Sequence, residues 1–442
     1  MFCRTFTTKL LTTGALLFLA GQSTAQDASN FGPQPRVFGG VDLGAYLERA
    51  SEANPDLEAF RQRYEAAEAR IPQAGSLPDP MFQVTQFVES VETRNGPQDQ
   101  VFMLNQRLPW FGKLDRKEAA ASAEAEALWF AWQARELEVA QMVANAFYEY
   151  AYTRKAIALT EESLALLEEL EPIVQERVRG GGDLNPLLRL KVEIGKFRDR
   201  QSSLEEKRHA QSARLAALLD LPAGVTLPWP EWGEPIPQPI PEGGLLVQAL
   251  ESNNPRLAML ERRVESAAVR RELARLEAFP DFTVGLNYIR LGEPSGAMTA
   301  PDPGKDPWGV MVAVNVPIWR ERINAGRSEA LASQRAAEAE LRDTENQLKS
   351  ELSVALSQLR DGQRRLDLYG EELLDLARQA LENTRSSYEA GRAGILEVID
   401  SERSLLELEL LYWRAAADTY QARVALQTLI NEPLYAGTPA NF

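Results

Sequence analysis

Four short stretches of the chain alternate between apolar residues and polar or small ones, the pattern of a β-strand whose two faces meet different surroundings. In the clearest stretch the apolar positions are Phe282, Val284, Leu286 and Tyr288. The alternation predicts strands at 80–90, 100–109, 281–291 and 307–317. Each contains roughly 10 residues, the length that a tilted strand needs to cross the hydrocarbon layer of a membrane.

Two much longer stretches carry apolar residues every three, four or seven positions, as on a helix with one apolar face. The spacing is almost strictly heptad at Leu341, Leu348, Leu352, Leu359, Leu366 and Leu373. We predict very long helices at 112–179 and 322–390, followed by shorter ones at 183–220 and 394–431. At ~1.5 Å per residue each very long helix would extend about 100 Å, far beyond an ordinary globular domain. Pro172 should either kink the first of them or be tolerated near its end.

The two halves of the chain follow the same plan. Asn54-Pro55 recurs as Asn254-Pro255, and the segment from Pro80 to Val84 recurs as Pro280 to Val284, both at an offset of 200 residues. Each half reads as a helix, two strands, a very long helix, a tight turn and another long helix. The first helices, at 43–70 and 245–277, should stack end to end with the last ones beside the very long helix. The sequence therefore predicts a mainly α fold with a small β part, built from one duplicated unit.

The first 25 residues have the features of a secretory signal peptide: positive charges, a short apolar run from Leu10 to Ala20, and small residues before the cut. That run is too short for a transmembrane anchor. The mature chain would start near Gln26. Its parts would be a first repeat at 26–221, a proline-rich linker at 222–243, a second repeat at 244–432 and a tail at 433–442.

Charge and composition exclude several functional classes. The formal net charge of -16 argues against nucleic acid or an anionic lipid surface as a partner. The one cysteine, Cys3, lies in the signal peptide, and the one histidine, His209, lies in a charged stretch typical of a protein surface. The chain contains neither Gly-x-Ser-x-Gly nor a phosphate-binding loop motif. We therefore expect no enzyme activity, no catalytic residues, no cofactor and no metal site.

The strand count has a geometric consequence. No segment after the signal peptide has about 18 consecutive apolar residues, so any membrane crossing must use the strands. Four strands cannot close on themselves, and each bare backbone group at an open edge in lipid costs several kcal/mol. Three copies would supply about twelve strands, an even number within the known range. The helices would then extend from the strands as a tube, so the sequence predicts a trimeric duct.

The order and lengths of these elements resemble the TolC-like outer membrane efflux protein family, over essentially the whole mature chain. The resemblance is carried by the repeated Asn-Pro, by the junction from Gln106 to Lys113, and by the turn from Ser387 to Asp400. The turn is the most specific, with its tyrosine, its glycine and two acids three residues apart. The fold implied is a homotrimer that forms a 12-stranded outer membrane β-barrel continued by a long periplasmic α-helical barrel.

The resemblance also implies a function. Members of the family are passive exit ducts in the outer membrane that work with a periplasmic adaptor protein and an inner-membrane pump of the RND or ABC type. The junction from Leu108 to Lys113 is similar to that of members attached to heavy-metal cation pumps. Drugs and a secreted polypeptide are alternative cargoes. A periplasmic coiled-coil scaffold or adaptor is the alternative from another class, but it would leave the four alternating strands unexplained.

Two acidic residues are candidates for the channel constriction. Glu397 and Asp400 are three residues apart, so both carboxylates point from one side of a helix. In the family, acids at positions resembling these line the narrow periplasmic mouth and set cation preference. Three copies would place about six carboxylates around one axis, a ring that attracts cations. An ordinary solvated helix face is the alternative interpretation.

Glycines mark both turns between long helices, where reversal of the chain requires a positive φ. The resemblance adds that such tips, including Arg392, dock the adaptor protein. The residues assigned to them are Gly180, Gly181, Gly182, Gly391, Arg392 and Gly394. The first tip has no clear acid one turn later, so we do not expect a latch between it and Arg392.

Aromatic residues lie at or near the ends of the predicted strands. They are Trp110, Phe111, Tyr288, Trp308 and Trp319. Such residues are typical of the belt where a membrane protein meets the lipid headgroups of the outer membrane. Packing at the junction of strands and helices would place them equally well.

Overall fold

The structure is a computed structural model that describes residues 38–233, 235, 239–293 and 304–432. The expected signal peptide, the expected C-terminal tail, and parts of the linker and of the loop before Asp306 lie outside these residues. The described residues form one compact unit. The two repeats therefore share one body.

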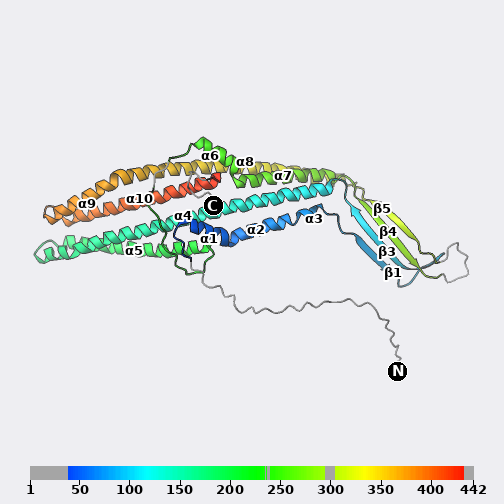
Figure 1. Cartoon of the computed structure of the whole chain (residues 1–442), viewed down its shortest axis with the longest axis horizontal. Helices are drawn as coiled ribbons and strands as arrows, with labels where there is room; N and C mark the ends of the chain where they lie inside the picture. The colour runs from blue at the N-terminus through cyan, green and yellow to red at the C-terminus, as the bar shows by residue number, and fades with distance from the viewer. Residues whose placement is uncertain (1–37, 234, 236–238, 294–303, 433–442) are drawn as a thin grey trace, which may run out of the picture. The chain divides into compact units, whose positions relative to one another are not determined.

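Both halves have the predicted order of elements (Figure 1). The first half contains α1 (Leu43–Ala53), α2 (Pro55–Glu68), α3 (Ile71–Gly75), β1 (Met81–Gln86), β2 (Glu92–Thr93), β3 (Gly96–Leu108), α4 (Lys113–Arg179) and α5 (Asn185–Leu218). The second contains α6 (Gly243–Asn253), α7 (Pro255–Leu276), β4 (Phe282–Leu291), β5 (Trp308–Val314), α8 (Arg320–Asp367), the π-helix η1 (Leu368–Leu373), α9 (Leu374–Glu389) and α10 (Ile395–Ile430). Among the described residues, no helix combines the length and the apolar character that a membrane span requires.

The first helix of each half is broken in two, so the prediction of single helices at 43–70 and 245–277 was wrong. The breaks lie at Asn54 and Asn254, whose Oδ1 atoms accept hydrogen bonds from the first backbone N–H groups of α2 and α7. Their Nδ2 groups donate to the carbonyl oxygens of Leu218 and Leu429, both at 2.9 Å, at the ends of α5 and α10. The repeated Asn-Pro therefore caps a new helix and joins it to the end of a long one.

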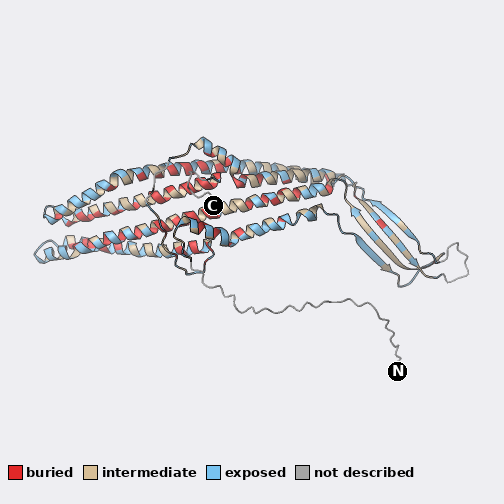
Figure 2. Cartoon of the chain, in the orientation of Figure 1, coloured by how far each residue is buried: buried red, intermediate tan, exposed pale blue. Residues whose placement is uncertain are grey.

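The long helices pack lengthwise against one another. Helices α1, α2, α3 and α5 all contact α4, so the shorter helices do run beside the very long one (Figure 1). The predicted heptad leucines include Leu348, Leu352 and Leu359, which are buried against α6 and α10. Figure 2 shows buried residues on the facing sides of the helices. A series of apolar clusters along the helices therefore replaces a single central core.

The second very long helix is not continuous, as the prediction of 322–390 had assumed. The π-helix η1 interrupts it, and there Gly370 lies so close to the ring of Tyr412 that a Cβ atom would stand 3.0 Å from it. A π-helical turn has hydrogen bonds between residues i and i+5 and mostly occurs as a single turn inside an α-helix. In contrast α4 passes through Pro172 without interruption, within its last two turns.

The strands form one antiparallel sheet in the order β1-β3-β4-β5, with β2 paired to the start of β3. The two halves meet where β3 pairs with β4. β5 ends at Val314, earlier than predicted, and the side chain of the next residue, Asn315, accepts a hydrogen bond from the backbone N–H of Asp281. β1 also ends earlier than predicted, at Gln86, whereas β3 begins earlier, at Gly96.

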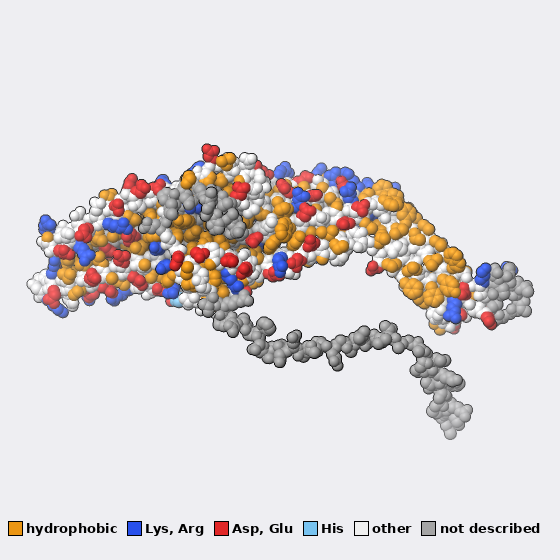
Figure 3. Space-filling model, in the orientation of Figure 1, with side chains coloured by type: hydrophobic (Ala, Val, Ile, Leu, Met, Phe, Trp, Pro, Cys, Tyr) orange, Lys and Arg blue, Asp and Glu red, His pale blue; other side chains and the backbone are white. Residues whose placement is uncertain are grey.

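The register of the sheet collects the apolar residues on one face. Val84, Phe102, Tyr288 and Trp308 are opposite one another across the four strands. The other face is mixed: polar and small residues lie there beside apolar ones such as Met103 and Met311, and a Cβ atom added to Gly285 would overlap the side chain of Asn105. Apolar side chains cover the strands in Figure 3. An exposed apolar surface of this extent requires an apolar environment to cover it.

Candidate functional site

The two turns between long helices have the same backbone geometry. In the first, the N–H groups of Gly181 and Gly182 donate to the carbonyls of Val178 and Arg177, and in the second those of Gly391 and Arg392 donate to Tyr388 and Ser387. Both patterns are Schellman motifs, which need one left-handed residue each. Gly181, with φ +98°, and Gly391, with φ +72°, supply it.

The prediction that the other tip glycines also need a positive φ was wrong. Gly180 has φ -74° and ends α4. Gly394 has φ -84° and ψ 153°, an extended conformation open to any residue, and it precedes the first turn of α10. A single left-handed residue already reverses each chain direction, so the flanking glycines are not needed for that purpose.

Both predicted acids of the constriction are exposed at the start of α10. The Oε1 atom of Glu397 accepts a hydrogen bond from the backbone N–H of Gly394 at 3.3 Å, which caps the helix. The carboxylate of Asp400 lies 3.9 Å from the Arg403 guanidinium. The structure thus places the two carboxylates within the first two turns of one helix, with Glu397 also serving as a cap.

One contact connects the two tips. The guanidinium of Arg177 lies 4.2 Å from the ring centroid of Tyr388 and donates to the Tyr388 carbonyl at 3.3 Å. Tyr388 is buried in the cluster that α4, α5 and α10 form near the tips. Tyr388 belongs to the predicted turn motif, but no local pattern pointed to Arg177, because the two residues are 211 positions apart.

A groove of about 360 Å³ lies beside the tips, between α5 and α10. Its apolar lining includes Leu188 and Val192, which are 51% and 59% exposed. Arg189, Lys196 and Arg403 add basic side chains to the rim. Glu193 and Asp400 also line it and pair with Lys196 and Arg403, so the groove offers apolar contact beside a rim of mixed charge.

The junction between strands and helices depends on a buried ionic group that the sequence analysis missed. Asp281, 6% exposed, accepts hydrogen bonds from Lys113 Nζ at 2.8 Å, Arg107 Nη2 at 2.7 Å and the backbone N–H of Trp110 at 3.0 Å. Lys113 is itself only 3% exposed and donates also to the Phe279 carbonyl at 3.1 Å. These bonds tie the end of β3 and the start of α4 to the start of β4.

The electrostatics of Asp281 follow from these bonds. Burial raises the pKa of its carboxyl group, but the hydrogen bonds from Lys113, Arg107 and the Trp110 N–H outweigh burial and lower the pKa to about 2. Asp281 is therefore ionised at neutral pH. Arg107 and Lys113 both belong to the motif from Gln106 to Lys113, so the structure gives that motif a physical role.

The five predicted interface aromatics divide between the two expectations. Trp110 stacks on Phe279 and Phe282, with ring centroids 5.2 and 5.8 Å apart, so it packs at the junction. Phe111, Trp308 and Trp319 are largely exposed. Tyr288 lies on the apolar face of the sheet, and its hydroxyl group hydrogen-bonds to Asp306. The exposed aromatics are thus free to meet lipid.

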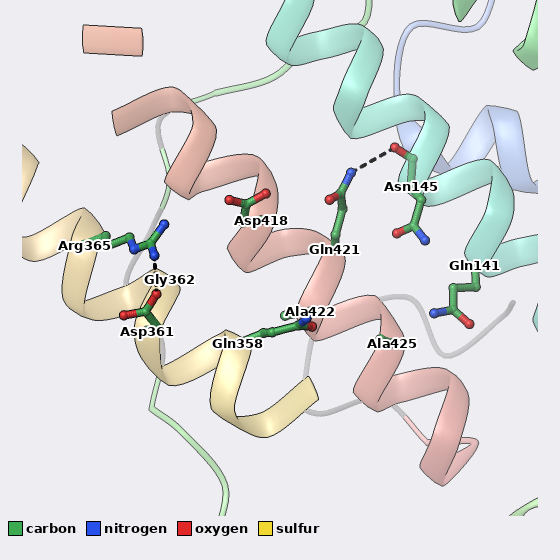
Figure 4. Close-up of a pocket in the computed structure, with 10 residues that line it drawn as sticks. All are labelled: Gln141, Asn145, Gln358, Asp361, Gly362, Arg365, Asp418, Gln421, Ala422 and Ala425. Atoms are coloured by element: carbon green, nitrogen blue, oxygen red, sulfur yellow. Dashed lines mark hydrogen bonds and ion pairs between the residues drawn. The ribbon is translucent and has the colours of Figure 1, made fainter. Parts of the chain in front are cut away.

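A polar cavity of about 470 Å³ lies between α4, α8 and α10, away from every predicted site residue (Figure 4). Asn145 and Gln421 line it together with the ion pair of Asp361 and Arg365, whose charged atoms are 2.8 Å apart. Across the described ranges, no group of three or more His, Cys, Asp or Glu side chains is arranged to hold a metal ion. No metal-holding group of that kind therefore lines the cavity in the described part of the chain.

The chain is similar to known proteins of efflux and export systems. Residues 246–432 match a family described as outer membrane efflux protein. The cobalt-zinc-cadmium resistance protein CzcC of Cupriavidus metallidurans is 24% identical over 405 residues, which cover 89% of this chain and 90% of that protein. The pyoverdine export outer membrane protein OpmQ of Pseudomonas aeruginosa is 24% identical over 446 aligned residues, covering 91% and 88%.

A solved structure supports the fold independently. The outer-membrane channel OprN superimposes with a TM-score of 0.75 at 18% sequence identity, over 88% of this chain and 89% of that one. The predicted mainly α fold with a small β part is thereby confirmed. Residues 246–432 thus match the outer membrane efflux protein family, the chain as a whole has the fold of TolC-like channels, and the protein resides in the outer membrane with a periplasmic part.

Proposed function

We propose that the protein is the exit duct of a tripartite efflux system, and that it passively conducts substrate from a periplasmic adaptor and an inner-membrane pump to the outside. The observation that carries the proposal is the combination of an apolar sheet face with a 67-residue helix, α4, that continues from the sheet. A helix of this length extends about 100 Å at 1.5 Å per residue. Strands provide the membrane crossing, and helices provide the conduit below it.

The open edges of the sheet support a trimer. In the described part of the chain, β1 and β5 each pair with a neighbour on one side only. In lipid, each unpaired backbone group at such an edge costs several kcal/mol, so the edges must be covered. We propose that β5 of one copy pairs with β1 of the next, which closes a barrel of about twelve strands in three copies.

Glu397 and Asp400 support a cation-selective mouth. Both carboxylates are exposed, and within the described ranges the ion pair that offsets their charge is a weak one between Asp400 and Arg403. Three copies would bring about six of them together and favour cations over anions at the constriction. CzcC is a cobalt-zinc-cadmium resistance protein by name, so we propose heavy-metal cations as the cargo. The duct would pass them without binding them.

The test of the mouth uses planar lipid bilayers. Channels of the wild-type protein should be blocked by multivalent cations, and the double variant Glu397→Ala, Asp400→Ala should lose most of that block. Glu382→Ala, which removes an exposed acid of α9, should keep it and serves as the control. Unchanged block in the double variant would remove the carboxylate ring from the account.

The helical tips and the groove between α5 and α10 are the proposed docking surface for the adaptor, which in turn contacts an RND or ABC pump. Exposed apolar side chains such as Val192 are the residues that a partner helix would cover. Crosslinking in cells followed by copurification should recover the adaptor and the pump. Val192→Glu should reduce the recovery, whereas Val354→Glu, a similarly exposed valine on α8, should not. Equal recovery from both variants would contradict docking at this groove.

A further inference from the structure

Glu402 is a buried acid near the proposed mouth that the proposed function does not use. It lies two residues beyond Asp400 on α10, which turns it about 200° around the helix, away from the exposed acids. Its side chain is only 4% exposed, and it lies between α10 and the helices packed against α10. A carboxyl group buried in this way is costly unless its charge is matched or its proton is kept.

The groups that face Glu402 do not match its charge. From α4, Ser163 is hydrogen-bonded to the carboxyl group, and Glu162 is close enough to repel a negative charge. From α9, Arg385 attracts it, but that guanidinium also lies 3.8 Å from the Glu389 carboxylate. Ser163 and the shared Arg385 therefore favour the charged form of Glu402, whereas burial and Glu162 disfavour it.

A second acid lies further along α10, and apolar side chains of α5 pack nearby. Further along α10, Glu409 repels a charge on Glu402, and it is bonded to Arg378 of α9 at 3.3 Å. From α5, Ile194 and Phe197 contribute apolar side chains to the cluster near the tips, which also holds Leu406, one turn along α10 from Glu402. Burial raises the pKa of Glu402 above the usual range of a glutamate, and Glu409 and Glu162 add to the rise, against the lowering by Ser163 and Arg385.

Ionisation of Glu402 would therefore favour a different packing. With a neutral carboxyl group, α10 packs closely on α4, as the structure has it. With a charged one, the group gains by reaching water, and that requires α10 to move away from α4. The start of α10 carries Glu397 and Asp400, so such a movement changes the width of the mouth.

We propose that Glu402 is a protonation-dependent switch: the neutral residue holds α10 against α4 and keeps the mouth narrow, and the ionised residue releases α10 and widens it. This proposal rests on the proposed function, because it assumes that the start of α10 borders a channel. Acidification would then close the duct and alkalinisation would open it.

The channel test compares the wild type with Glu402→Gln, which keeps the shape and hydrogen bonding but cannot ionise. Single-channel conductance is measured in planar bilayers between about pH 4.5 and 8. The wild-type conductance should rise with pH, and the variant should stay at the low level throughout. Glu407→Gln, an exposed acid on the same helix, should follow the wild type. A variant at position 402 that keeps the wild-type rise would overturn the switch.

A second measurement does not depend on channel activity. Because the folded protein raises the pKa of Glu402, its neutral form stabilises the fold, and that stability is lost as pH rises through the raised pKa. The unfolding temperature of the detergent-solubilised wild type should fall over this range, and Glu402→Gln and Glu402→Leu should lack that part of the fall. Identical dependence of the unfolding temperature on pH in the wild type and in both variants would refute the switch. Absence of channels in every variant would instead refute the proposed function.

Discussion

Replacement of Asp281 by asparagine tests whether the junction between sheet and helices is held by buried charge. The amide side chain would keep an acceptor for Arg107 but would leave Lys113, buried at 3% exposure, with only the more distant carboxylate of Glu277, at 3.8 Å, as an ionic partner among the described residues. The native pKa of Asp281 lies at about 2 against an ordinary value of 3.8. At 1.36 kcal/mol per pKa unit, that difference corresponds to roughly 2 to 3 kcal/mol of stability at neutral pH. We expect Asp281→Asn to lose about this amount.

The lowered pKa of Asp281 sets the direction in which stability should change with pH. A depressed pKa contributes stability above the unfolded value of 3.8, and that stability is lost as pH falls towards the native value of about 2. Thermal unfolding of the detergent-solubilised protein should therefore separate wild type and variant at neutral pH and bring them together under strong acid. Asp79→Asn, an exposed aspartate before β1, should match the wild type. Equal unfolding temperatures of wild type and Asp281→Asn at neutral pH would refute the reasoning. So would a difference between the two temperatures that persists at about pH 2.

Two further variants test the local architecture by the same unfolding assay. Asn254→Ala removes both a helix cap and the hydrogen bond to the Leu429 carbonyl and should cost about 1 to 3 kcal/mol of stability. The exposed Asn383→Ala is the control. A loss of stability in Asn254→Ala no larger than in the control would speak against the role of the repeated Asn-Pro. Gly391→Ala must adopt φ +72° and should cost about 1 to 2 kcal/mol. Gly394→Ala, at φ -84°, should cost little, and equal losses would contradict the assignment of the left-handed position.

The long helices and the strands were predictable because each has a regular period that extends over many residues. The heptad leucines of α8 and the alternation along β4 are examples. In both elements the apolar residues lie together on one face, as the pattern predicted. The breaks at Asn54 and Asn254 had a local signal, since asparagine before proline is typical of a helix start. The apolar spacing continues on both sides of each break, and a single helix was therefore predicted there.

The contacts of the junction and the tips could not be found in the same way. Lys113 and Asp281 are 168 positions apart, and nothing in either local sequence names the other as its partner. In the first half, Met81 occupies the position that corresponds to Asp281, so the repeat itself gave no hint. The π-helix η1 likewise depends on how closely Tyr412 of α10 approaches Gly370, which is a property of the packed helices.

The most direct test of the proposed duct is the mass of the protein extracted from outer membranes in detergent, measured by native mass spectrometry. A chain whose sheet has two open edges must share them with neighbours in lipid, so the mass of three chains is the expected result. A monomer that is released with the periplasmic fraction and stays in solution without detergent would contradict the account.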